Sequence, residues 1–156
     1  MVKVLIKKLN PSVELPAYKT DGASGMDLMA FIKEPIIIKP KTSCLVPTGL
    51  SVAFSSDFEI QIRPRSGLAA KYNISVLNTP GTIDSDYRGE LKIILFNHGD
   101  NDFLINNKDR IAQMVLTPVT KISLEETDNL PKTMWTYHEN YCICKHSQHY
   151  YISIPQ

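Results

Sequence analysis

Prolines occur at short intervals through most of the chain, at positions 11, 16, 35, 40, 47, 64, 80 and 118. Proline has no backbone N–H and clashes with the preceding helical turn, so few windows could hold a long helix. Short alternating or β-branched runs lie between the prolines, at 2–9, 36–40, 44–54, 58–64, 74–78, 91–97, 102–105 and 110–119. Their length and spacing predict an all-β sandwich or jelly roll. One short helix is expected at 66–72 (SGLAAKY), with Ser66 as its cap.

Bulk properties narrow the classes of function. The 156 residues are enough for one domain with a real core. The formal net charge of +1 gives no basic field for duplex nucleic acid, and the apolar runs are too short to cross a bilayer, so neither partner is expected. Three irregularly spaced cysteines argue against a disulfide scaffold and for a cytoplasmic location.

The segment 81–91, GTIDSDYRGEL, lies between two apolar runs and predicts a β-hairpin with a charged tip. A carboxylate held near a water can act as a general base, which makes Asp84 and Asp86 candidates. Both aspartates could equally be turn formers, since Asp favours turns. Tyr87 could equally be a half-buried strand residue.

Two other segments carry candidate polar sites. In 63–69, RPRSGLA, the Arg65 guanidinium, the Ser66 hydroxyl and the backbone at Gly67 could bind an anion, or form an ordinary strand end with a capping serine. In 22–30, GASGMDLMA, Asp27 precedes an apolar strand. It could be a satisfied buried carboxylate or an outer-shell metal residue.

The segment 108–119, KDRIAQMVLTPV, predicts a strand. Strict alternation places Ile111, Gln113 and Val115 on one face and Arg110 on the other, with Ala112 and Met114. A buried Gln needs partners for its amide, so Gln113 indicates a ligand or is a satisfied surface residue.

The composition changes near residue 131. Most of the histidines and cysteines lie beyond it, and the last glycine of the chain is Gly99. Potential soft-metal ligands crowd this tail, at His138, Cys142, Cys144, His146 and His149. Their spacing is not that of a zinc finger.

Four of these stretches in this order, ASGMDL, RPRSGLA, NTPGTIDSDYRGEL and DRIAQM, resemble the four leading motifs of the trimeric dUTP diphosphatase (dUTPase) family, over about residues 1 to 130. The resemblance implies a distorted β jelly roll, nucleotide metabolism as the role, and a homotrimer with three active sites at subunit boundaries. In the family, the third motif comes from one subunit, the second and fourth from its neighbour, and a C-terminal arm from the third. The reaction it implies is hydrolysis of dUTP to dUMP and diphosphate, assisted by Mg²⁺.

The resemblance also implies a role for individual residues. Asp84 matches the general base, and Asp27 the residue that holds the waters of the metal. The phosphate-binding positions are Arg65, Ser66, Gly67 and Gln113. The nucleoside-binding positions are Asn78, Gly81, Thr82, Ile83, Asp84, Tyr87 and Lys92, with the Tyr87 ring under the deoxyribose. Arg88 and Asp86 are expected to fix the hairpin.

The sequence departs from the family at its end. The fifth motif, a Gly-rich lid with Arg, Phe and Ser, has no counterpart in 135–156, which lacks Gly, Phe and Arg. We therefore expect a dUTPase-like β domain at 1–130 and an atypical arm at 131–156. Turnover would then be reduced, and the alternative is an impaired or non-catalytic dUTP-binding trimer. The related dCTP deaminases and capsid-type β-trimers fit the four motifs less well.

Overall fold

The computed structural model describes residues 2–131, which form eleven strands and one helix. The elements are β1 (Leu5–Lys8), β2 (Met26–Met29), β3 (Ile36–Ile38), β4 (Ser43–Pro47), β5 (Leu50–Ala53), β6 (Phe58–Arg63), α1 (Ser66–Tyr72), β7 (Ile74–Val76), β8 (Gly81–Ile83), β9 (Lys92–Asn97), β10 (Phe103–Ile105) and β11 (Arg110–Pro118). The chain divides into a unit Met1–Lys121, which holds all of these elements, and a unit Ile122–Gln156, of which 122–131 contain no helix or strand.

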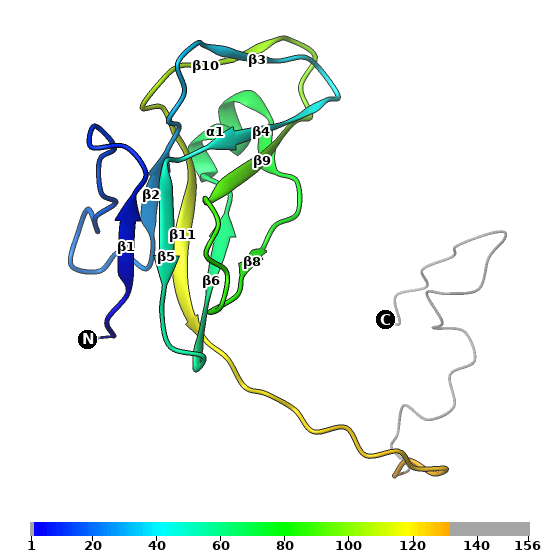
Figure 1. Cartoon of the computed structure of the whole chain (residues 1–156). Helices are drawn as coiled ribbons and strands as arrows, with labels where there is room; N and C mark the ends of the chain where they lie inside the picture. Colours follow the sequence, from blue (N-terminus) through cyan, green and yellow to red (C-terminus); the bar gives the residue numbers. More distant parts are fainter. Residues whose placement is uncertain (1, 132–156) are drawn as a thin grey trace, which may run out of the picture. The chain divides into compact units, whose positions relative to one another are not determined.

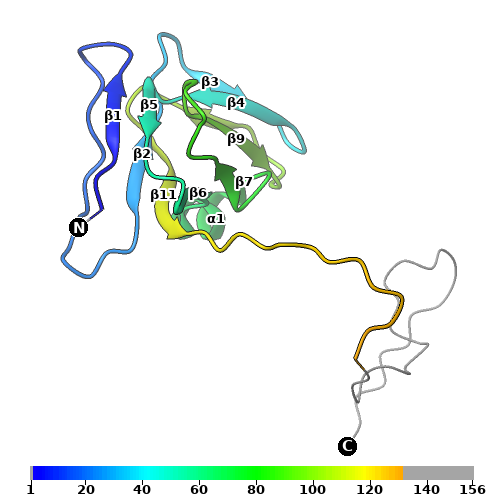
Figure 2. The same cartoon turned by 60° about the horizontal axis from the view of Figure 1, so that its bottom comes forward.

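The strands form antiparallel sheets that share one core. The largest has the order β2-β11-β6-β8, and Figure 1 shows β11 (yellow) between β2 and β6. Figure 2 shows β4, β9 and β7 side by side in a second sheet, and two-stranded pairs β1–β5 and β3–β10 complete the unit. Fully buried aliphatic side chains from both large sheets, such as Leu28, Ile60, Val46 and Ile93, belong to one apolar cluster. The all-β prediction is confirmed.

Helix α1 has the bounds that the sequence predicts, but Ser66 does not cap it. The N-cap residue is Arg65, without a side-chain capping bond, and Ser66 is the first helical residue. The helix ends at Asn73, which adopts a left-handed conformation with φ 56°. Within residues 2–131 no helix is long and apolar enough to cross a membrane.

Strand β2 starts earlier than the sequence indicates. Asp27 was expected to precede an apolar strand, yet it lies inside β2, opposite Gln113 of β11. Gly25, two residues before Asp27, allows β2 to lie close to β11, because a Cβ at position 25 would lie 3.0 Å from Val115 Cγ2. Asp27 therefore belongs to the ladder and shares a sheet face with Gln113.

The alternation expected along β11 is wrong at its start, because the strand is irregular there. Gln113 pairs with Asp27, but the register then shifts so that Arg110, not Ile111, is opposite Met29. One extra residue in β11 lets Ile111 and Ala112 both be buried, at 2% and 0% exposure. Arg110 therefore joins the face of Gln113 instead of the opposite one.

The two apolar runs expected to flank a hairpin tip at 81–91 do pair, since β7 and β9 are antiparallel neighbours with Val76 opposite Leu95, but the tip itself contains the unexpected strand β8. Strand β8 pairs with β6, while β9 pairs with β4 and β7, so residues 84–90 connect two different sheets. The end of this connection is held beside β5 by Leu91, which is 1% exposed and whose backbone forms hydrogen bonds with Leu50 and Thr48. We call residues 84–90 the crossing loop.

Candidate functional site

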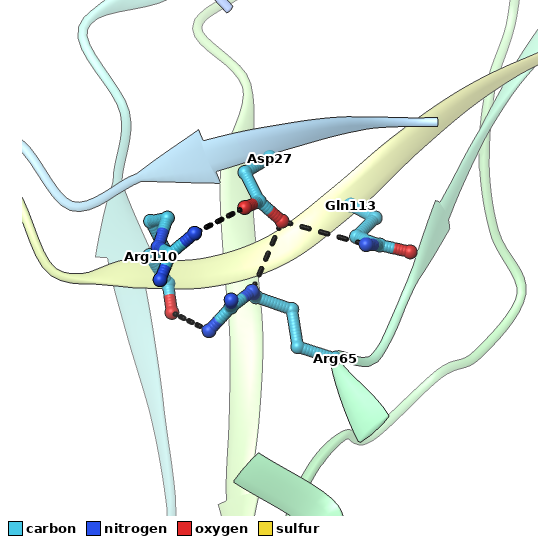
Figure 3. Close-up of polar contacts among 4 residues, drawn as sticks. All are labelled: Asp27, Arg65, Arg110 and Gln113. Atoms are coloured by element: carbon cyan, nitrogen blue, oxygen red, sulfur yellow. Dashed lines mark hydrogen bonds and ion pairs between the residues drawn. The ribbon is translucent and has the colours of Figure 1, made fainter. Parts of the chain in front are cut away.

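Asp27 is the centre of a polar cluster on the outer face of the largest sheet (Figure 3). Its Oδ1 accepts hydrogen bonds from Arg65 Nε at 3.0 Å and Gln113 Nε2 at 3.4 Å. Its Oδ2 accepts one from Arg110 Nη1 at 3.2 Å. A single carboxylate thus holds three side chains of phosphate-binding type, Arg65 from the start of α1 and Arg110 and Gln113 from β11.

Strand pairing explains why these residues meet. Asp27 is opposite Gln113, and Gln113 is opposite Arg63 at the end of β6, so their side chains share one face. Arg65 follows two residues later, at the N-terminus of α1, and turns back toward Asp27. Its Nη1 also donates to the Arg110 carbonyl oxygen at 3.2 Å.

The cluster carries excess positive charge. Two guanidinium groups surround one carboxylate, and the Asp27 side chain is only 10% exposed. The Arg65 side chain is 21% exposed and that of Arg110 53%. Each guanidinium has five N–H donors, and Asp27 uses one from each, so several remain for an anion.

Ser66 and Gly67 extend this surface. Both are exposed at the start of α1, directly after Arg65. A Cβ added at Gly67 would meet nothing within 4 Å, so packing inside this chain does not require glycine there. A bare backbone in open space is what a closely bound ligand needs.

The crossing loop presents Asp84 and Tyr87 to solvent. The Tyr87 hydroxyl donates to the Glu90 carbonyl at 3.0 Å. Arg88 Nη1 donates to the carbonyls of Ser85, at 2.6 Å, and Tyr87, at 3.0 Å. The expected structural role of Arg88 fits these bonds. The same expectation for Asp86 has no support, since its side chain makes no hydrogen bond within residues 2–131.

The remaining nucleoside candidates adjoin this loop. Gly81, Thr82 and Ile83 form β8. Exposed Asn78 lies over Gly81, where a Cβ would be 3.1 Å from the Asn78 amide nitrogen. Lys92 Nζ lies 3.7 Å from a carboxylate oxygen of Glu90.

The two groups of candidates do not meet within one chain. Asp27 is opposite Gln113, whereas Ile83, the last residue of β8, is at the level of Leu116 through β6. Asp27 is three strands away from the start of the crossing loop, at about 4.8 Å per strand, and three residues away along the strands, at about 3.3 Å per residue. These two perpendicular offsets combine to a separation of roughly 17 Å. The Asp27 cluster and Asp84 are therefore separate surfaces of this chain.

Sequence reasoning missed Arg110 as a site residue. Strict alternation placed it on the wrong face, and only the register shift in β11 brings it to Asp27. The available signal was a charged residue before two consecutive buried positions, Ile111 and Ala112, which strict alternation cannot bury together.

Within residues 2–131 no three His, Cys, Asp or Glu side chains gather closely enough to bind a metal ion by themselves. The Cys and His residues of the tail, from His138 to His149, lie outside the described residues.

The Glu14–Lys108 ion pair ties the N-terminal segment to the turn before β11. Lys108 Nζ lies 2.6 Å from Glu14 Oε1, and this bond holds the pKa of the Glu14 carboxyl below its ordinary value. The stabilisation from this ion pair is therefore fully present above the ordinary pKa of Glu, and it is lost as the pH falls through the lowered pKa of Glu14. Both side chains are more than half exposed, so water screens the pair, and it contributes little to holding the turn that leads into Arg110.

Comparisons with known proteins agree on one family. The dUTPase family model matches residues 12–141. The deoxyuridine 5'-triphosphate nucleotidohydrolase of Treponema denticola is 55% identical over 126 residues, covering 81% of this chain and 88% of the relative. The Rickettsia conorii protein of the same name is 51% identical over 135 residues, covering 86% and 91%.

Solved structures show the same fold. The dUTPase of Staphylococcus aureus phage phi11 superimposes with a TM-score of 0.75 at 18% identity, over 83% of this chain and 99% of that one. A mutant of the phage 80alpha dUTPase with dUpNHpp gives 0.77, also at 18% identity, over 92% and 98%. The predicted jelly roll is confirmed, and the chain belongs to the dUTPase family.

Proposed function

We propose that this protein is a dUTP diphosphatase that hydrolyses dUTP to dUMP and diphosphate in the cytoplasm, by attack of water on the α-phosphorus. The family match and the relatives named for this activity support the proposal. The observation that carries it is the Asp27 cluster, where one carboxylate presents Arg65 and Gln113 beside Ser66 and Gly67.

The phosphate chain would bind at this cluster. Arg65 and Gln113 supply donors, Ser66 a hydroxyl, and Gly67 an unobstructed backbone. Phosphoryl transfer depends chiefly on positioning and charge stabilisation, which donors fixed in advance supply without reorganisation.

The nucleoside would bind at β8 and the crossing loop. Thr82 and Ile83 lie along β8, and exposed Asn78 beside Gly81 would contact the base edge. Tyr87 would pack under the deoxyribose and Lys92 would lie at the end of the loop. Asp84, exposed at the loop start, would take a proton from the attacking water.

Magnesium fits the Asp27 cluster only through water. One carboxylate cannot enclose the ion, but Mg²⁺ keeps several waters when substrate phosphates bind it. Among residues 2–131, Asp27 Oδ2 accepts one hydrogen bond, from Arg110, and so has a lone pair that could accept a metal-bound water. Bound there, the ion would offset negative charge on the phosphates.

The active site needs several subunits, and a homotrimer is the proposed assembly. The separation of roughly 17 Å estimated from strand spacing keeps Asp84 away from the Asp27 cluster in one chain. Large apolar side chains on outer sheet faces, such as Leu45, Ile37 and Leu104, are half exposed and could be covered by other subunits. We expect sedimentation equilibrium at micromolar concentration to give three copies of the 17.6 kDa chain. A monomer would contradict the shared site.

Selectivity for dUTP over UTP is expected to depend on Tyr87. Replacing it by Ala should raise kcat/KM for UTP relative to dUTP by about tenfold, because loss of one shape constraint is worth about 1–3 kcal/mol. Tyr18→Ala is the control, since Tyr18 is similarly exposed, at 55% against 43%. Steady-state kinetics with both nucleotides measure the ratio. An unchanged ratio in Tyr87→Ala would place the ribose elsewhere.

Diphosphate release from dUTP, with dTTP, dCTP and UTP as controls, tests the whole proposal. Release from dUTP above the other nucleotides supports it. The second candidate function is an impaired dUTP-binding trimer. It is favoured by the segment 131–156, which we propose to be an atypical arm because residues 135–156 contain no Gly, Phe or Arg. Calorimetric binding of dUTP without diphosphate release would establish that candidate.

A further inference from the structure

Arg110 reaches the Asp27 cluster because of the irregularity in β11. In a regular ladder Arg110 would be opposite Ala30, which is 2% exposed and belongs to the core. The register shift places it opposite Met29 instead, on the polar face. Bulges next to active sites commonly redirect a side chain in this way.

Arg110 holds Arg65 through two routes. Its backbone carbonyl accepts Arg65 Nη1 at 3.2 Å, while Asp27 Oδ1 accepts Arg65 Nε at 3.0 Å. The Arg110 guanidinium binds the other oxygen of Asp27, at 3.2 Å. The Arg65 fork is thereby fixed at two of its three nitrogens, and the third is left to meet a ligand (Figure 3).

The charge balance also depends on Arg110. With Arg65 alone, the Asp27 carboxylate would cancel the only positive charge of the cluster. The second guanidinium shares that carboxylate, which leaves one net positive charge. Both arginines line the same surface cavity, together with Leu68, Phe103 and Asp109, so the unused donors of Arg65 are accessible. The net positive charge is that of Asp27, Arg65 and Arg110 alone, because Asp109 adds a carboxylate to the lining, where it accepts a hydrogen bond from the Asn106 N–H.

We propose that Arg110 is a positioning residue of this hydrolase: it shares the Asp27 carboxylate, which keeps the Arg65 guanidinium aligned and leaves its positive charge only partly neutralised toward the phosphate chain. This inference rests on the proposed dUTP hydrolysis. It assigns Arg110 no contact with substrate, so its effect passes through Arg65.

The first test compares Arg110→Gln with Arg63→Gln. Arg63 is an exposed cation of the same sheet face, but its guanidinium bonds to Gln61 and not to Asp27. We expect Arg110→Gln to raise the Kd of the non-hydrolysable analogue dUpNHpp about tenfold, the low end for a charge-assisted bond, and to leave the Kd of dUMP unchanged. Arg63→Gln should change neither. Equal effects of the two variants would overturn the proposal.

The second test is a double-mutant cycle. If Arg110 acts through Arg65, the pair Arg65→Gln and Arg110→Gln should bind dUpNHpp no more weakly than Arg65→Gln alone. Losses that multiply would show that Arg110 contacts the phosphates itself and would overturn the positioning role. Arg110→Lys keeps the charge and should fall between wild type and Arg110→Gln. Binding as weak as that of Arg110→Gln would overturn the charge-sharing role.

Wild-type protein in the same assay separates this inference from the function. Wild type that neither binds dUpNHpp nor releases diphosphate from dUTP would refute the proposed function. Wild type that does both, with Arg110→Gln indistinguishable from it, would refute only the role of Arg110.

Discussion

Replacing Asp84 by Asn is expected to lower the turnover of dUTP by about 10² to 10⁴, the usual contribution of a general base. The amide keeps the size and shape of the side chain but cannot accept the proton of the attacking water. Asp84 is exposed at the start of the crossing loop, so the substitution should leave the fold intact. Single-turnover diphosphate release gives the rate, and calorimetry with dUpNHpp should show binding close to that of wild type.

Asp86→Asn is the matched control for this prediction. Asp86 lies two residues away in the same loop and is also exposed, so both variants change the loop charge equally. Asp86→Asn should retain turnover within a few-fold of wild type. If the Asp84 variant also retains it, Asp84 is not the base. If both variants lose activity alike, the loop charge matters and no single proton acceptor is identified.

Local features of the fold could be predicted from the sequence. Prolines and β-branched runs gave the all-β class, and the segment 66–72 gave α1 with its bounds. Both signals are local. A proline disfavours helix at its own position and in the preceding turn, and a short helix can form where a few consecutive residues lack the alternation typical of a strand. Strand β8, only three residues long, carries no comparable signal and was missed.

Pairings between distant segments could not be predicted. The sequence indicated a hairpin between the apolar runs that flank 81–91, and β7 and β9, which come from these runs, do pair. The sequence did not indicate that β8, inside the expected tip, pairs with β6, or that β9 also pairs with β4. The register shift in β11 is also non-local, because it depends on the core burying Ile111 and Ala112 together.

The site shows the same division. Motif order indicated Asp27, Arg65 and Gln113 separately, and the structure brings these three together. For Arg110 the sequence offers only an indirect signal, the two apolar residues that follow it, and the register of β11 decides on which face it lies. The candidates Asp84 and Tyr87 are exposed in the crossing loop although β8 and its pairing with β6 were not expected, since exposure requires only a surface connection.

Replacing Asp27 by Ala is expected to lower the free energy of unfolding by about 3 kcal/mol, the low end for breaking a buried ion pair. Two guanidinium groups would lose their shared carboxylate, and Arg65, at 21% exposure, reaches water only in part. Gln113 would lose the same acceptor. Chemical denaturation at one fixed protomer concentration measures the change, because the stability of an oligomer depends on concentration.

Asp100→Ala provides the contrast that makes the Asp27 result interpretable. Asp100 pairs with Lys41 at 3.2 Å, the same distance as Arg110 to Asp27, but its side chain is 91% exposed against 10% for Asp27. An exposed pair contributes at most about 1 kcal/mol, so Asp100→Ala should change stability little. Diphosphate should restore more stability to Asp27→Ala than to wild type, because an anion between the two guanidinium groups replaces the missing charge. Equal losses in the two variants, or no added effect of diphosphate, would mean that Asp27 contributes packing and not the counter-charge of an anion site.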